Sequence, residues 1–134
     1  MASRRGLDAT ATGGSRAMTV AREYPYLSDY AAIGDSRSVA LVSRDGSIDW
    51  CCWPRFDSPS IFARLLDWEK GGYWSVRPTV PYTARQAYLG PTNVLATTFS
   101  TSTGTVRVVD FMPALTEVQK RSWPVPFRQI TRRI

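Results

Sequence analysis

Residues 38–53 read SVALVSRDGSIDWCCW, and this stretch decides the fold class. Its first part, 38–43, is a short apolar run with β-branched residues, which is typical of a strand. Residues 44–47 contain Asp-Gly, a strong signal for a tight hairpin turn. Residues 48–53 then return as a second apolar run, and Pro54 ends it because proline lacks the donor that a strand ladder needs. The pattern predicts an antiparallel β-hairpin.

Further short strands are predicted downstream, separated by glycine, proline and asparagine turns, at residues 73–77, 82–89, 94–101 and 105–111. The chain has no alternation of strand and long helix and no glycine loop of the kind that cradles phosphates. Many short strands at close spacing are typical of two packed antiparallel sheets. The sequence therefore predicts an all-β, antiparallel β-sandwich.

One short helix is also predicted, after the hairpin. Ser58 is suited to cap its start, and Pro59 is suited to its first turn. The apolar residues that follow fall on one helical face at Ile61, Phe62, Leu65 and Leu66. The glycine pair at 71–72 would end the element.

Composition excludes several classes of protein. At 134 residues and 15.0 kDa the chain has the size of one domain. No apolar run approaches the roughly 18 residues of a membrane-spanning helix, so no membrane partner is expected. The chain has no histidine, which excludes the Ser-His-Asp triad and histidine-based zinc sites. Two cysteines cannot make a four-thiolate site, and we expect neither a metal nor a cofactor.

The positive charge lies at the two ends of the chain. The formal net charge is +6, with +3 in residues 1–22, +4 in 117–134 and −1 in 23–116. Proteins that bind nucleic acids usually concentrate their charge on the folded face that meets the phosphates. The middle of this chain carries no such excess, and we expect no nucleic-acid partner.

The N-terminal end predicts a disordered extension, whereas the C-terminal end predicts a strand. Residues 1–22 are rich in Ala, Thr, Gly, Ser and Arg and lack the apolar stretch of a secretory signal, so we expect a disordered basic extension. Met18 is the expected natural start. Residues 127–134 alternate like a strand but stop without a turn, which predicts a domain truncated within a strand.

The two cysteines, Cys51 and Cys52, are adjacent. A disulfide between neighbours needs strained geometry, so we expect free thiols and a cytoplasmic location. Successive strand residues point to opposite faces, which predicts one thiol in the core and the other near an interface.

An ordered set of segments carries a family resemblance: YLSDYAAIGDSR at 26–37, ALVSRDGSIDW at 40–50, WPRFDSPSIFARLLD at 53–67 and VVDFMP at 108–113. The set resembles the N-terminal domain of the bacterial glucoamylase and trehalase-like enzymes of glycoside hydrolase family 15. The resemblance covers roughly residues 24–134, and its most specific block runs from DGSIDW to PRFDSP. Ser36 and Cys52 depart from it, since Cys and Leu would be expected there.

The resemblance implies a fold, an activity and a partner. The fold is a super-sandwich of antiparallel strands, joined by a linker to an (α/α)6 barrel. The activity is inverting hydrolysis of α-glucosides such as trehalose or α-glucans, with both catalytic glutamates in the barrel. This chain, with its domain at 23–134, would then be an incomplete N-terminal domain. It would carry no catalytic residue, be inactive alone, and have the barrel of the same polypeptide as its partner.

The acidic residues agree with that expectation. Inversion needs two carboxyls roughly 6.5–9.5 Å apart. The glutamates, Glu23, Glu69 and Glu117, are scattered along the chain, and nothing in the sequence pairs them. Asp45 and Asp49 flank the hairpin turn, where turn chemistry explains Asp45.

The loop after the hairpin is the candidate site, because rigid loops on a β scaffold often carry recognition. Its candidates for the substrate pocket or the barrel interface are Trp53, Arg55, Phe56, Asp57 and Ser58. In one interpretation Asp57 only pairs with Arg55 or a backbone amide and orders the loop. In the other, the loop faces the barrel and borders the substrate.

Two other functions stay open beside a hydrolase fragment. One is a stand-alone carbohydrate-binding or interaction module, which predicts a natural stop codon and affinity for oligosaccharides. The other is a basic nucleic-acid-associated protein, which predicts salt-dependent binding. The strand that breaks off at the C-terminal end favours the fragment.

Overall fold

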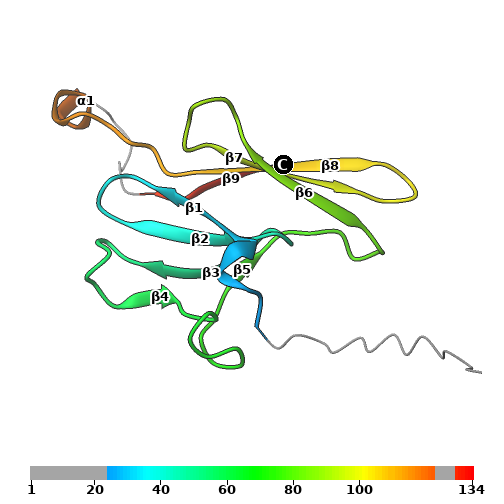
Figure 1. Cartoon of the computed structure of the whole chain (residues 1–134). Helices are drawn as coiled ribbons and strands as arrows, with labels where there is room; N and C mark the ends of the chain where they lie inside the picture. Colours follow the sequence, from blue (N-terminus) through cyan, green and yellow to red (C-terminus); the bar gives the residue numbers. More distant parts are fainter. Residues whose placement is uncertain (1–23, 123–128) are drawn as a thin grey trace, which may run out of the picture.

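The computed structural model describes residues 24–122 and 129–134, which form two antiparallel sheets packed face to face (Figure 1). The first sheet contains β1 (Tyr30–Gly34), β2 (Val39–Ser43), β3 (Ser47–Cys52), β4 (Ser60–Phe62) and β5 (Trp74–Ser75). The second contains β6 (Thr83–Tyr88), β7 (Leu95–Ser100), β8 (Thr105–Phe111) and β9 (Thr131–Arg133). The expected antiparallel β-sandwich is confirmed.

The predicted hairpin lies at the centre of the first sheet, whose strand order is β1-β2-β3-β4 with β5 also on β3. Val42 lies opposite Ile48 across β2 and β3. Gly46 closes the turn with a φ of +75°, and a Cβ there would lie 2.8 Å from Cζ of Phe99 on β7. The turn therefore needs glycine both for its backbone conformation and for its close approach to the second sheet.

The core lies between the sheets. Its buried apolar cluster comprises Ile33, Ala40, Val42, Ile48, Cys51, Leu95 and Met112. Polar side chains of β6 also cross between the sheets: Tyr88 hydrogen-bonds the backbone of Ala32, and Gln86 donates to the carbonyl of Ser43 at 3.1 Å. These bonds tie the two sheets together, and the bond from Gln86 satisfies a carbonyl of the buried residue Ser43.

A buried ion pair joins the last strand to both sheets. Arg132 on β9 forms two bonds with Asp110 on β8, at 2.7 and 2.9 Å, and the two side chains are 2% and 0% exposed. The same guanidinium donates to the carbonyls of Gly46 and Trp74 in the first sheet, both at 2.8 Å. One arginine therefore connects the hairpin turn, β5 and the second sheet.

The prediction of a short helix after the hairpin is wrong. The apolar residues there begin strand β4, in which Phe62 pairs with Cys51 and Ser60 pairs with Cys52, and turns follow. The free edge of β3 accounts for this, because pairing with it satisfies the backbone groups of residues 60–62. The one α-helix in the described residues is α1 (Glu117–Ser122), and a 3₁₀ turn, η1 (Leu27–Asp29), precedes β1.

The prediction of free thiols is confirmed, but the prediction that only one of the two cysteines lies in the core is wrong. Both are free, but both are buried, because the β3–β4 register shifts between Cys51 and Cys52 and breaks the strict alternation of faces. Burial raises the pKa of the Cys51 thiol above its ordinary value. A neutral buried thiol is a poor nucleophile.

At the C-terminal end, Val109 pairs with Arg133 and Phe111 with Thr131, so β9 confirms a strand within the predicted stretch. Phe127 and Arg128 lie outside the described residues, as do Met18 and the expected extension at 1–22. Neither η1 nor α1 has the length and apolar character of a membrane-spanning helix.

Candidate functional site: the 53–58 loop and the groove beside β4

The loop at residues 53–58 leaves the end of β3 and is held at both ends by backbone hydrogen bonds. The amide of Trp53 donates to Pro59 at 3.3 Å, and the amide of Ser58 donates to Arg55 at 3.1 Å. In the middle of the loop, the amide of Phe56 donates to the carbonyl of Arg37 at 2.9 Å. The loop is therefore tied to the segment that precedes β2.

Asp57 pairs with Arg55, as the first of the two interpretations expects. The Arg55 guanidinium donates to both carboxylate oxygens, from Nε at 3.0 Å and from Nη2 at 3.2 Å. Both side chains are more than half exposed, so water screens the pair and it adds little to stability. The two hydrogen bonds instead hold the Arg55 guanidinium and the Asp57 carboxylate in a fixed relative orientation on the surface.

Phe56 lies between these two residues in the sequence, and it is 66% exposed. A phenyl ring in water contributes nothing to folding, since its apolar area stays hydrated. Large aromatic residues that are exposed in one domain often supply contacts to another surface. Phe56 therefore has the chemistry of an interface contact.

Trp53 instead lines a separate hollow, which we name the β4 groove. It has a volume of about 220 Å³ and is lined by Trp53, Ile61, Phe62, Trp74 and Ile130. Ile61 and Trp74 remain exposed, while Trp53 packs partly against the core. The groove offers apolar walls and aromatic rings at the sheet edge formed by β4 and β5, and none of the described residues that line it is ionisable. Its chemistry suits an apolar side chain or the face of a sugar ring.

A buried polar cluster on the same sheet was missed by the sequence reasoning, which treated Asp49 only as a residue beside the turn. Asp49 is 1% exposed and accepts hydrogen bonds from the hydroxyl of Tyr30, at 2.9 Å, and from Ser47. Burial, and then the hydrogen bond to Asp49, raise the pKa of the Tyr30 phenol above its ordinary value. Only contacts distant in sequence could reveal this cluster.

The cation of the cluster is Arg64. Its Nη1 lies 3.8 Å from the Asp49 carboxylate, and its guanidinium lies 3.7 and 3.9 Å from the ring centres of Trp68 and Tyr73. The amide of Leu65 donates to the backbone carbonyl of Asp49 at 3.1 Å. These contacts hold the 63–73 segment on the first sheet, and no sequence motif signals them.

The described aspartates are engaged in structural contacts. Asp49 and Asp110 are buried beside arginines, and the other described aspartates, Asp29, Asp35, Asp45, Asp57 and Asp67, bind arginines or backbone amides. Glu69 and Glu117 are exposed on different segments, and Glu23 lies outside the described residues. No three potential metal ligands come together within 24–122 and 129–134. The described aspartates therefore order segments of the fold.

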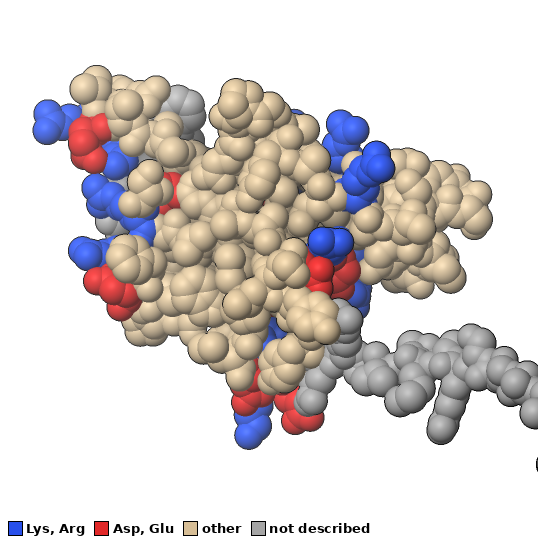
Figure 2. Space-filling model, viewed as in Figure 1, with Lys and Arg blue, Asp and Glu red and all other residues tan. Residues whose placement is uncertain are grey.

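The surface charges are mixed. On the face in Figure 2, Lys and Arg side chains lie near the periphery, often beside Asp or Glu, and a wide uncharged area separates them. The Arg37–Glu117 and Arg77–Asp45 pairs are examples of this mixing. This face does not have the continuous positive track that a phosphate backbone requires.

Comparison with known proteins places the chain in a family. Residues 15–126 match the family model described as "Trehalase-like, N-terminal". Trehalase 1 of Sulfolobus acidocaldarius is 49% identical over 82 residues, 60% of this chain. The trehalase of Thermoplasma volcanium is 39% identical over 104 residues, 75% of the chain. The trehalase of Mycobacterium tuberculosis is 36% identical over 104 residues, 74% of the chain.

The chain spans only a small part of these relatives: 14% of the Sulfolobus protein, 16% of the Thermoplasma protein and 15% of the Mycobacterium protein. No solved structure matches the chain significantly. The match to the family model includes the hairpin, the 53–58 loop and strands β1 to β8. The chain therefore belongs to the family of trehalase-like N-terminal domains.

Proposed function

We propose that this domain serves a longer α-glucoside hydrolase, for which it is a non-catalytic N-terminal part. One observation carries the proposal: this chain matches only 14–16% of the length of proteins named trehalase. The chemistry of the chain supports it, because the described carboxylates have structural partners or lie exposed and apart. Catalysis would then depend on residues elsewhere in the same polypeptide.

The catalytic part of that hydrolase is an (α/α)6 barrel, which holds the two glutamates of an inverting reaction. The names of the relatives favour trehalose over maltose or longer α-glucans as the substrate. Residues 1–22 form a basic extension, and residues 23–134 belong to the N-terminal domain. The free, buried thiols support a reducing, cytoplasmic compartment.

The 53–58 loop and the β4 groove form the surface that meets the barrel. Phe56 and Trp74 expose aromatic area near the first sheet's edge, and the groove can accept an apolar side chain. The fixed Arg55–Asp57 pair lies on the same loop as Phe56, where its charges can orient sugar hydroxyls at the border of the substrate pocket.

The DNA that follows codon 134 tests the proposal as a whole. We expect an open reading frame, in frame or displaced by a frameshift, that encodes a helical barrel with two acidic motifs. A stop codon followed by an unrelated gene would contradict the proposal. It would favour a stand-alone carbohydrate-binding module, for which calorimetry of this chain with trehalose and maltose is the direct measurement.

Asp57→Ala in the full-length enzyme tests the role of the loop. We expect kcat/KM for trehalose to fall about tenfold, which is ~1.4 kcal/mol of transition-state stabilisation. The melting temperature should hardly change, because an exposed pair is worth at most about 1 kcal/mol. Steady-state kinetics and thermal unfolding measure the two effects.

Asp45→Asn is the matched control for Asp57→Ala. It removes the charge from another exposed Asp–Arg pair, with Arg77, and keeps a residue type that suits the hairpin turn. This variant should retain wild-type kcat/KM. Unchanged kinetics in Asp57→Ala with unchanged stability would restrict Asp57 to ordering its loop.

A further inference from the structure

The edge of the first sheet at β1 is covered by side chains from the second sheet. β1 is the outer strand there, and β2 pairs with it on the other side. In an antiparallel pair, every second residue of an outer strand directs its N–H and C=O away from the partner strand. Along β1 these residues include Ala32 and Gly34, whose backbone groups bond side chains of β6 and of the turn after it.

Two side chains satisfy all four of these backbone groups. The Tyr88 hydroxyl accepts a hydrogen bond from the amide of Ala32 at 3.0 Å and donates to its carbonyl at 2.8 Å. The side-chain amide of Asn93 accepts from the amide of Gly34 at 3.3 Å and donates to its carbonyl. Each side chain thus offers one donor and one acceptor to one residue, as a residue of a neighbouring antiparallel strand does. We name Tyr88 and Asn93 the edge latch.

The turn that carries Asn93 is ordered by other bonds. The amide of Leu89 donates to the carbonyl of Val94 at 2.9 Å, and the Thr92 hydroxyl donates to the carbonyl of Leu89 at 2.6 Å. The amide of Val94 also donates to the Thr92 hydroxyl at 3.2 Å. The side chain of Asn93 takes no part in these bonds and reaches across to the first sheet instead.

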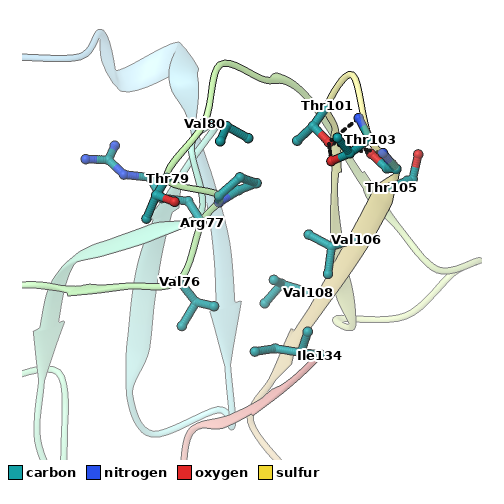
Figure 3. A pocket seen from close by; sticks show the side chains of 12 residues that line it. Val76, Arg77, Thr79, Val80, Thr101, Thr103, Thr105, Val106, Val108 and Ile134 are labelled. Carbon is teal, nitrogen blue, oxygen red and sulfur yellow. Dashed lines mark hydrogen bonds between the residues drawn. The ribbon is translucent and has the colours of Figure 1, made fainter.

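The turn between β7 and β8, which borders the hollow in Figure 3, shows the ordinary arrangement. The Thr101 hydroxyl donates to the carbonyl of Gly104 at 3.0 Å, and it accepts from the amides of Thr103 and Gly104, both at 3.2 Å (Figure 3). These bonds stay within the turn and order it. The bonds of Asn93 join two sheets, so the ordering of a turn does not explain them.

The sequence of β1 explains why its edge needs a cover. Outer strands are usually protected from pairing with other chains by a charge, a proline or a bulge. β1 reads YAAIG, without charge or proline, and its five pairs with β2 run without a register shift. The outer strands β6 and β9 contain arginines, and the pairing of β4 with β3 is shifted. Without the edge latch, β1 would present a regular, uncharged edge that another strand can join.

We propose that Tyr88 and Asn93 substitute for a neighbouring strand and thereby close the β1 edge to a second copy of this chain. A second copy suits this edge because two β1 strands can pair antiparallel about a two-fold axis, with Ala32 opposite Ala32. In that pair the N–H and C=O of Ala32 bond across the axis. The edge latch and the second copy therefore compete for the same backbone groups. The inference does not rest on the proposed function.

The double variant Tyr88→Phe/Asn93→Ala opens the edge latch and keeps the ring of residue 88. In dilute solution we expect the amides of Ala32 and Gly34 to exchange hydrogen about tenfold faster than in the wild type. The self-association constant from sedimentation velocity should rise by about tenfold, the effect of roughly one net hydrogen bond gained between copies. Tyr73→Phe/Thr103→Ala is the matched control, because it makes the same kinds of change at another exposed tyrosine and another turn. The control should alter neither measurement.

Ala32→Cys locates the contact between the copies, since Ala32 is exposed and the native thiols are buried. Residues opposed in a hydrogen-bonded pair have Cα atoms about 5.5 Å apart, which a disulfide can bridge. A mild oxidant should cross-link this variant into dimers when the edge latch is open and leave it monomeric when the latch is intact.

Three results would overturn the proposal. The first is rapid exchange of the Ala32 and Gly34 amides in the wild type, which would mean that the edge latch does not form. The second is a double variant that exchanges rapidly at both amides and stays monomeric. The third is association without a cross-link at position 32, which would assign the contact to another surface. Tyr88→Phe alone repeats each measurement if the double variant does not fold.

Discussion

Arg132→Met should destabilise the domain by about 3–5 kcal/mol, because it leaves the carboxylate of Asp110 buried without its cation. Methionine preserves much of the apolar volume but donates no hydrogen bond. The carbonyls of Gly46 and Trp74 therefore lose their partner as well. Urea unfolding followed by tryptophan fluorescence measures the loss. A domain of this size has roughly 5–15 kcal/mol of stability, so this loss is a large fraction of the total and should lower the urea midpoint markedly.

The adjacent arginine on the same strand is the matched control. Arg133 is exposed, and Arg133→Met should change the free energy of unfolding by no more than about 0.5 kcal/mol. Similar losses in the two variants would mean that β9 needs positive charge in general. The prediction for Arg132 depends instead on its position between the two sheets.

Arg64→Ala should cost about 3 kcal/mol and release the 63–73 segment. The change leaves Asp49 buried without a cation and removes a guanidinium that packs between Trp68 and Tyr73. Equilibrium unfolding measures the cost, and limited proteolysis measures the release, since a segment freed from the sheet becomes a better protease substrate.

Two variants separate charge from shape at this position. Arg64→Lys keeps the charge but lacks the planar group that stacks between two rings, so it should recover only part of the loss. Arg44→Ala removes the partner of Asp29 from an exposed pair and should stay within about 0.5 kcal/mol of wild type. Wild-type stability and protease resistance in Arg64→Ala would show that Asp49 is satisfied by Tyr30 and Ser47 alone.

The strands that the sequence predicted share one property: their signals are local. The Asp-Gly turn and the apolar runs beside it predict β2 and β3, and glycine or threonine turns delimit β6, β7 and β8. β1 was not predicted, because the run YAAIG is short and rich in alanine. Its pairing with β2 along five residue pairs makes it a strand.

The contacts of the candidate site also fall into two groups: those that the sequence signals locally and those that only the fold creates. The Arg55–Asp57 pair is two residues apart and was foreseen as one of two interpretations. The β4 groove could not be foreseen, because Ile61 and Phe62 had been assigned to a helix, and Trp74 and Ile130 reach the groove only through the fold. Asp49 and Arg64 are fifteen positions apart, and no periodicity relates them.

The sequence by itself determined the sheet class, the central hairpin, the free thiols and the family, because turn chemistry, alternation and a long specific block act within neighbouring residues. Tertiary structure alone decided that residues 60–62 extend a sheet, that Arg64 meets Asp49, and that Arg132 reaches the hairpin turn 86 positions earlier. The physical reason is the cost of burial. A buried charge or backbone group takes whichever partner the fold brings within reach, and that choice has no local signature in the chain.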